Sequence, residues 1–314
     1  MKKLLFLLLI FFPVLFFASC SNTLNPYAPF RERYALSGII RSDTSLQVIT
    51  VSRSYQPPNY NPGADTENVA VLGAEVNMWC NDTLYALRDT SIPRSDTSHY
   101  KSNVSFYYCN NFIPPPNSDI EIQALLPNGI LLSSVTKTPD AGYGFFDAAS
   151  NTTYPTSHPQ LYVGWNNLGN IYYAPRISII YYQKGDTNSK ELLVPLSYIN
   201  QNGKLTPNYP QPTKINFFTI DNSTLDEAMR EISGSDPNKN DFTISKIMVY
   251  VIVYDENLSS YYSSIQNSVD NFTVILDAAD YSNITGGFGI FGSYYKASWR
   301  IDITRSYLNS FGYN

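Results

Sequence analysis

Alternating apolar and polar residues recur along residues 34–138 and constrain the fold more than any other feature of the sequence. Residues 74–78 read Ala-Glu-Val-Asn-Met, and residues 120–124 read Ile-Glu-Ile-Gln-Ala. A period of two places successive side chains on opposite faces of a β-strand, which indicates sheets with one buried and one solvated face. Seven strands in about 105 residues predict an immunoglobulin-like β-sandwich, although the Trp and Cys spacing of antibody domains is absent. The seven strand-like segments are YALSGIIR, LQVITVSRSY, VLGAEVNMW, TLYALR, VSFYYC, IEIQALL and ILLSSVTK.

Residues 139–314 continue the β pattern and are predicted to form a second β-rich domain with two short helices. The polar segment KTPDAG marks the boundary between the two domains. One helix is expected to begin at Asn222 or Ser223, because Ser223 and Asp226 have the spacing of a capping box. The other is expected over residues 258–269, where Leu, Tyr, Ile and Val recur at helical spacing.

The composition agrees with a mainly β fold. The chain has 26 tyrosines, aromatic residues make up 15% of it, and charged residues are few. Aromatic residues favour strands, and the many Asn, Ser, Thr and Pro residues favour turns between them. The run over residues 247–253 is apolar without alternation, which predicts a strand buried on both faces.

The chain opens with MKKLLFLLLIFFPVLFFASC. Two lysines, an apolar run over residues 4–17, and the small residues Ala18 and Ser19 have the layout of a secretory signal. The run is too short to span a bilayer comfortably, since that takes roughly 20 apolar residues, and Pro13 interrupts it. The sequence therefore predicts an exported protein.

Residues 17–20 look like a bacterial lipobox, in which a peptidase cleaves before a lipid-modified cysteine. Residues 1–19 are then the lipoprotein signal peptide, and Cys20 is the lipidation site, carrying acyl chains such as palmitate. Residues 20–33 follow as a polar tether with two prolines. The alternative is an ordinary cleaved signal with an incidental cysteine.

Removal of the signal leaves 295 residues with 19 Lys and Arg against 26 Asp and Glu, a formal net charge of −7. No block of basic residues is present, so the sequence indicates no nucleic-acid partner. Acyl chains rather than charge would hold the protein at a membrane.

Two further cysteines remain. Cys80 and Cys109 both end strand-like segments, and we expect them to form a disulfide in an oxidising compartment. Such a bridge would close a loop of about 30 residues and stabilise the fold by roughly 3–4 kcal/mol on the chain-entropy model. Two separately buried thiols are the alternative. A zinc site is not expected, because no cysteine pair has ligand spacing and the two histidines lie far apart.

Several segments together resemble a known family. They are LSGIIRSDTSLQVITVSRSYQPP, VLGAEVNMWCNDTLYAL, KIMVYVIVYDENLSSYYSSIQNSV and the motif NITGGFGIFG at residues 283–292. They are similar to DUF4249, a family of lipoproteins found mainly in Bacteroidetes and relatives. The resemblance implies a lipid-anchored envelope protein with an immunoglobulin-like first domain. It also implies genes that often accompany TonB-dependent outer-membrane receptors, and it carries no catalytic residue.

The motif at residues 283–292 contains a formal G-x-G-x-x-G. Nucleotide binding needs this motif between a strand and a helix, and here a strand-like segment follows with only 22 residues left. We interpret it as a structural turn where backbones pass closely, with Phe288 and Phe291 packed over it. Its glycines are Gly286, Gly287, Gly289 and Gly292.

The sequence gives little support for a hydrolase active site or a calcium site. A serine hydrolase would have to use His99 or His158, which both lie in polar, loop-like stretches. A glycosidase needs two carboxylates across a cleft. Asp277 and Asp280 precede the glycine motif and Asp255 and Glu256 end an apolar strand, but nothing in the sequence brings two of these acids together across a cleft. The loops NPGADTEN and SGSDPNKND are rich in oxygen ligands but lack the spacing of an EF-hand calcium site.

We therefore expect a lipid-anchored outer-membrane protein that binds a partner and is not an enzyme. A TonB-dependent receptor or its ligand is the expected partner, and no cofactor or metal is expected. An envelope glycan hydrolase and a surface adhesin or assembly factor are the alternatives. The sequence does not indicate which face of the membrane the protein occupies.

Overall fold

The computed structural model describes residues 29–56, 68–98, 102–140, 145–146, 153–166, 169–201, 204–234, 236–267 and 281–313. Residues Arg33–Asn314 form one compact unit. The predicted signal peptide, Cys20 and most of the tether lie outside the described residues.

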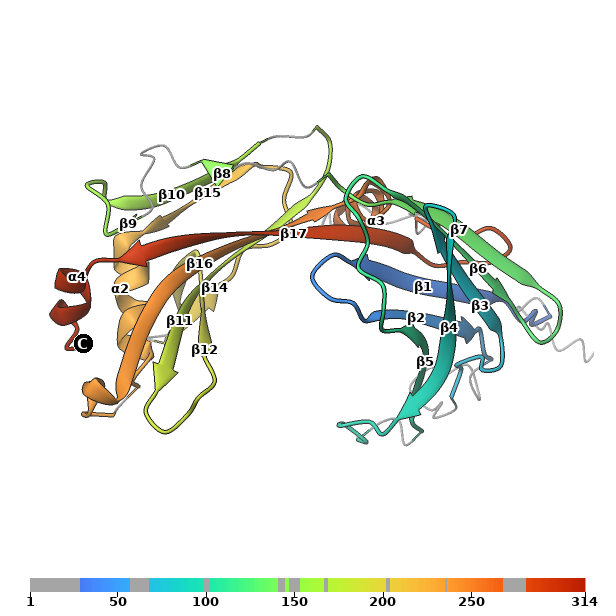
Figure 1. Ribbon diagram of the computed structural model, residues 1–314, viewed down its shortest axis with the longest axis horizontal. Helices are drawn as coiled ribbons and strands as arrows, with labels where there is room; N and C mark the ends of the chain where they lie inside the picture. The colour runs from blue at the N-terminus through green and yellow to red at the C-terminus, as the bar shows by residue number, and fades with distance from the viewer. Residues whose placement is uncertain are drawn as a thin grey trace, which may run out of the picture. The chain divides into compact units, whose positions relative to one another are not determined.

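All seven strands predicted for residues 34–138 are present (Figure 1). Alternation accounts for them: Val76, Met78 and Cys80 of β3 are buried, while Glu75 is exposed. They are β1 (Tyr34–Arg41), β2 (Gln47–Arg53), β3 (Glu75–Cys80), β4 (Thr83–Ile92), β5 (Val104–Cys109), β6 (Asp119–Leu125) and β7 (Leu131–Lys137).

The rest of the chain adds ten strands and four helical segments to the described residues. The strands are β8 (Phe145–Phe146), β9 (Thr153–Tyr154), β10 (Gln160–Trp165), β11 (Tyr173–Gln183), β12 (Lys190–Val194), β13 (Ser197–Gln201), β14 (Lys204–Asn208), β15 (Phe217–Asp221), β16 (Phe242–Tyr254) and β17 (Phe291–Ile303). The helices are α2 (Asn222–Glu231), the 3₁₀ turn η3 (Lys239–Asp241), α3 (Glu256–Asn267) and α4 (Arg305–Ser310).

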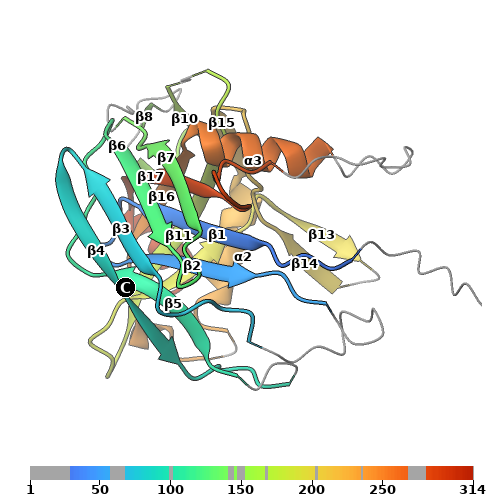
Figure 2. The same cartoon turned by 90° about the vertical axis from the view of Figure 1, so that its right-hand side faces the viewer.

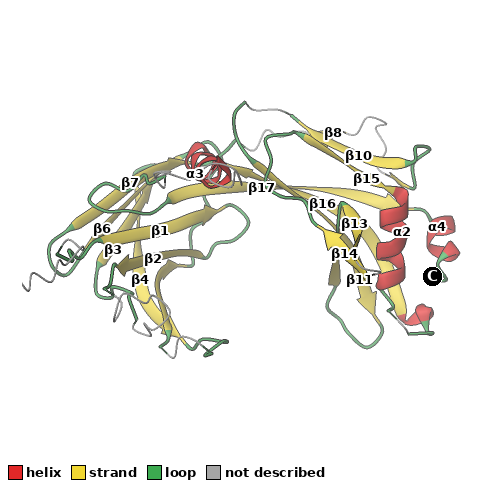
Figure 3. Ribbon diagram, turned by 180° about the vertical axis from the view of Figure 1, so that it is seen from behind, coloured by secondary structure: helices red, strands yellow, loops and turns green. Residues whose placement is uncertain are grey.

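The prediction of a mainly β chain with α2 and α3 is confirmed (Figure 3). The helix α4 was not predicted; it is only six residues long, with Thr304 as its N-cap. The immunoglobulin-like sandwich stays a prediction. No helix among the described residues is long and apolar enough to cross a membrane.

The prediction that residues 247–253 are buried on both faces is wrong. In β16, Ile247, Val249 and Val251 are buried, whereas Tyr250 and Ile252 between them are only partly buried. The strand therefore has one buried face and one partly buried face. Its second face carries large apolar and aromatic side chains in place of polar ones, which is why the sequence pattern does not alternate.

One mixed sheet contains twelve strands, and β17 lies within it between β16 and β1. On one side β17 pairs with β16 in antiparallel register, and on the other it pairs with β1 in parallel register (Figures 1 and 2). The main path of the sheet runs β12-β11-β16-β17-β1-β2-β5-β4-β3-β6-β7. Strands from the two ends of the chain thus become neighbours.

Two main hydrophobic cores lie on this sheet. One gathers buried residues between Leu36 and Leu132, together with Ile284 and Phe291 from the C-terminal part of the chain. The other gathers residues between Tyr154 and Tyr313. The cores divide the chain near the predicted boundary, but residues near the start of β17 belong to the first. The boundary itself stays a prediction.

Candidate functional site

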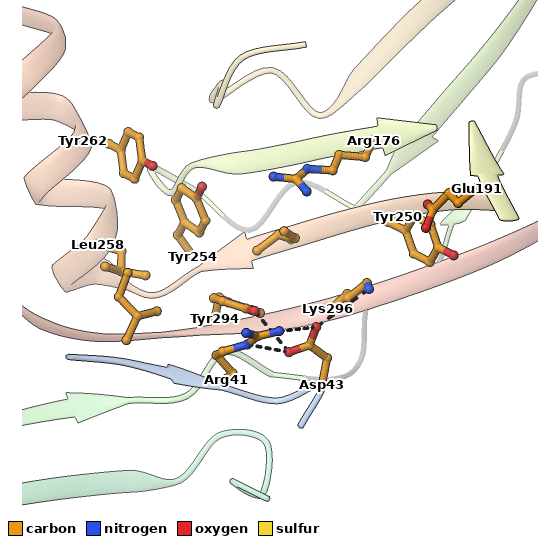
Figure 4. Close-up of a pocket in the computed structure, with 12 residues that line it drawn as sticks. Arg41, Asp43, Arg176, Glu191, Tyr250, Tyr254, Leu258, Tyr262, Tyr294 and Lys296 are labelled. Carbon is orange, nitrogen blue, oxygen red and sulfur yellow. Dashed lines mark hydrogen bonds and ion pairs between the residues drawn. The ribbon is translucent and has the colours of Figure 1, made fainter. Parts of the chain in front are cut away.

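A cavity of about 380 Å³ lies on the face of the sheet where β1, β17, β16 and β11 run side by side, and α3 borders it (Figure 4). We call it the tyrosine cleft. Its lining residues are Ile39, Arg41, Asp43, Arg176, Glu191, Tyr250, Ile252, Tyr254, Leu258, Tyr262, Tyr294 and Lys296.

Strand register explains how these side chains meet. The second face of β16 points Tyr250 and Tyr254 into the cleft. In the next strand, Tyr294 pairs with Tyr254 and Lys296 pairs with Ile252. The parallel pairing with β1 then brings Arg41 opposite Tyr294, although the two residues lie at opposite ends of the chain.

Four polar residues form a connected cluster along one wall (Figure 4). Arg41 donates to Asp43 through Nε at 3.1 Å and through Nη2 at 3.3 Å. The Tyr294 hydroxyl also donates to Asp43, at 3.1 Å, and the Lys296 ammonium lies 3.8 Å from Oδ2 of this carboxylate. These contacts orient the side chains of this wall.

The charge states within this cluster follow from its contacts. Partial burial disfavours the Asp43 carboxylate, but the hydrogen bond and the charge of Arg41 outweigh it and lower the pKa of Asp43. Burial, reinforced by the Asp43 charge, raises the pKa of Tyr294 to about 12. At neutral pH the carboxylate is therefore ionised and the phenol protonated.

The other tyrosines of the cleft are also held in place. Tyr254 and Tyr262 stack with ring centroids 5.0 Å apart and planes 24° apart. Burial raises the pKa of Tyr254, and the neighbouring Tyr262 phenol adds to the rise. The Lys296 ammonium lies 4.4 Å from the centroid of the Tyr250 ring, a cation–π contact.

Arg176 differs from the other two cations of the cleft. It is the one exposed position of β11 between Tyr173 and Ile180. Its guanidinium points along the cleft toward Tyr254 and has no hydrogen bond or ion pair among the described residues (Figure 4).

Asp255 is a buried carboxylate beside the cleft, where β16 ends and α3 begins. Its Oδ1 accepts from the backbone N–H of Leu258 at 2.8 Å, which caps the helix. Its Oδ2 accepts from the backbone N–H of Ser293 at 3.0 Å and from the hydroxyl of Thr136. Burial raises the pKa of Asp255 to about 6, although these hydrogen bonds favour the charged form.

The glycine motif is a place where backbones pass closely. A Cβ on Gly289 would lie 2.0 Å from the Leu36 carbonyl oxygen, and one on Gly286 would lie 2.2 Å from that of Leu131. Gly287 and Gly292 are similarly confined, by Tyr34 and Leu258. No nucleotide-type helix follows the motif, because β17 begins at Phe291.

The two phenylalanines of the motif have different surroundings. Phe291 is fully buried, as expected, but Phe288 is 46% exposed, so the expectation that Phe288 packs over the glycines is wrong. Backbone hydrogen bonds explain the difference: Phe288 pairs with Tyr34 and Leu36 through its main chain, which leaves the ring outside under the Arg33 guanidinium.

The expected disulfide is not found: Cys80 and Cys109 are both free, buried thiols. Cys80 ends β3, which pairs with β6, and its thiol lies beside the Ser118 hydroxyl. Cys109 ends β5, which pairs with β2, and its thiol contacts the backbone of Gln47. Each sulfur thus has its own neighbours, and burial raises the pKa of both thiols.

The other residues considered as catalytic or metal-binding do not come together in a site in the part of the chain that the structure describes. His158 is exposed, and His99, Asp277 and Asp280 lie outside the described residues. The loop NPGADTEN also lies outside them, except for Asn68. In the loop SGSDPNKND, Asp241 pairs with Lys184. No group of three or more His, Cys, Asp or Glu that could hold a metal ion occurs among the described residues.

The tyrosine cleft was missed by the sequence reasoning. One available signal was a charged residue, Arg176, inside the otherwise uncharged strand segment IYYAPRISII. Another was the i, i+2 spacing of Tyr250, Ile252 and Tyr254. The pairing of β1 with β17, which closes the cleft, has no local signal.

The chain was compared with protein families and with curated proteins. A family model described as a domain of unknown function, DUF4249, matches residues 24–300. No curated protein matches the chain.

Proposed function

The chain belongs to the DUF4249 family, and from this premise we propose that it is a lipid-anchored cell-envelope protein that binds a ligand in the tyrosine cleft. We propose a binding or accessory role and no enzymatic one. The outer membrane is the proposed location, with a TonB-dependent receptor as a proposed partner.

The N-terminal sequence supports the anchor. A basic head, an apolar run and small residues precede Cys20, and a polar segment with two prolines follows it. A lipid on Cys20 would hold the protein at the membrane, and the tether would let residues 33–314 reach a partner there.

The preformed geometry of the cleft supports the binding role, and this observation carries the proposal. Most of its side chains come from strands of one sheet, Leu258 and Tyr262 come from α3, and hydrogen bonds already orient the Arg41–Asp43–Tyr294 wall. Small-molecule sites are typically preformed concavities with apolar and aromatic walls and a few placed polar groups. Rigid aromatic rings add contact area at low entropic cost.

Site-specific photo-crosslinking in intact cells tests this role. Tyr250 lines the cleft, and Tyr182, on β11 outside it, is 42% exposed. We expect benzoylphenylalanine at position 250 to give a light-dependent adduct with an envelope component that the same residue at position 182 does not give. Identical patterns from the two positions, or no adduct from position 250, would contradict the proposal.

A further inference from the structure

We infer that the ligand of the tyrosine cleft is a small organic acid with a flat, mostly apolar body, and that the guanidinium of Arg176 binds its carboxylate. This inference rests on the proposed binding role of the cleft. It adds the chemical class of the ligand and the residue that selects it.

The first observation is the unequal pairing of the charged groups. Arg41 and Lys296 both contact Asp43, so two cations share this carboxylate. Glu191 lies near the hydroxyl of Tyr250 and has no cation paired with it among the described residues. Arg176 is left without a carboxylate partner, and it points into the cavity. The cleft therefore has one more cation than carboxylates, in a chain whose formal net charge is −5.

The second observation is the nature of the free cation. A guanidinium presents a planar fork of N–H donors that matches a carboxylate in two parallel hydrogen bonds. The phenols of Tyr254 and Tyr262 lie at the end of the cleft toward which Arg176 points (Figure 4). Their rings stack, and each hydroxyl has a proton that it can donate to an acceptor. An anion at this end would meet donors only.

The third observation is the size and lining of the remaining space. A cavity of about 380 Å³ is at the small end of the range for small-molecule sites. Ile39, Ile252 and Leu258 line it together with the tyrosine rings. Such walls suit a flat apolar or aromatic body attached to the acid group.

Calorimetric titration of the full chain in detergent with 2-naphthoate and its neutral amide, 2-naphthamide, tests the inference. The two probes have nearly the same shape and differ in charge. Since a hydrogen bond to a charged group contributes roughly 1.5–3 kcal/mol, we expect the acid to bind about tenfold or more tightly than the amide. Arg176→Gln should remove this preference. Arg300→Gln, an exposed arginine of β17 that does not line the cleft, should retain it.

Equal affinity for the two probes, a preference that survives Arg176→Gln, or no binding of 2-naphthoate would each overturn the inference. The photo-crosslink from position 250 separates this failure from failure of the proposed function. If that crosslink persists while the acid preference is absent, the cleft binds another class of ligand. If both the crosslink and the acid preference are absent, the proposed binding role of the cleft is contradicted too.

Discussion

At the scale of single residues, Asp255 is a buried carboxyl group that connects several elements. It is 5% exposed, and it joins the end of β16 to α3, β7 and β17 through hydrogen bonds to Leu258, Thr136 and Ser293. Burial disfavours its charged form, so its pKa in the folded chain is about 6 against an ordinary value of 3.8. The folded state therefore holds a proton on Asp255 over a pH range in which the unfolded state has lost it.

The sign of the pH effect follows from this difference. Because the folded-state pKa is raised, the contribution of Asp255 is fully present below about pH 4 and is lost as the pH rises to about 6. The loss amounts to about 3 kcal/mol, since each pKa unit corresponds to about 1.4 kcal/mol. In urea unfolding between pH 4 and 7, the stability of the wild type relative to Asp255→Asn should fall by this amount.

The exposed neighbour Glu256 supplies the control. Glu256→Gln also removes one carboxylate from the start of α3, but its side chain is exposed, so it should leave the fall between pH 4 and 6 in place. A stability difference between wild type and Asp255→Asn that does not change with pH would contradict the account of Asp255.

At the scale of elements, the glycine motif fixes how the segment before β17 passes β1. Gly289 has a φ of +113°, and a Cβ there would lie 2.0 Å from the Leu36 carbonyl oxygen of β1. Gly185 also has a positive φ, +87°, but a Cβ there would meet nothing within 4 Å. Gly185→Ala should cost about 1–2 kcal/mol, the strain of a positive φ alone. Gly289→Ala should cost about 2 kcal/mol or more beyond this, because backbone has to shift.

Thermal or urea unfolding of the two variants measures the difference. The pair is matched in residue type and in the sign of φ, so the excess for Gly289→Ala reports the contact with β1. Equal losses of stability in the two variants would show that the close passage is not a constraint on the fold.

The elements differ in how far the sequence could predict them. The first seven strands were predicted because alternation is local information. β16 was assigned the wrong burial because its second face is lined with Tyr250 and Ile252 rather than with charges. The cleft could not be predicted, because the partners Arg41 and Tyr294 come together only through the pairing of the first strand with the last.

The cysteines also show that strand pairing cannot be predicted from local sequence. The sequence indicated that Cys80 and Cys109 end strands, which is correct, but strand ends alone do not say which sheet neighbours each strand has. The structure places β3 and β5 on opposite sides of β4 and leaves both thiols free.

At the scale of the whole molecule, the proposed role of the tyrosine cleft depends on the lipid anchor. The folded unit Arg33–Asn314 begins thirteen residues after Cys20, so a lipid there would keep the tyrosine cleft at the membrane where its proposed partners are. Labelling of cells with palmitate, followed by membrane fractionation, tests this claim most directly. Cys80→Ser, at a buried thiol of β3, is the matched control. We expect the wild type and Cys80→Ser to incorporate label and sediment with membranes, and Cys20→Ser to do neither. A Cys20→Ser protein that still takes up palmitate and stays with the membranes would contradict the account.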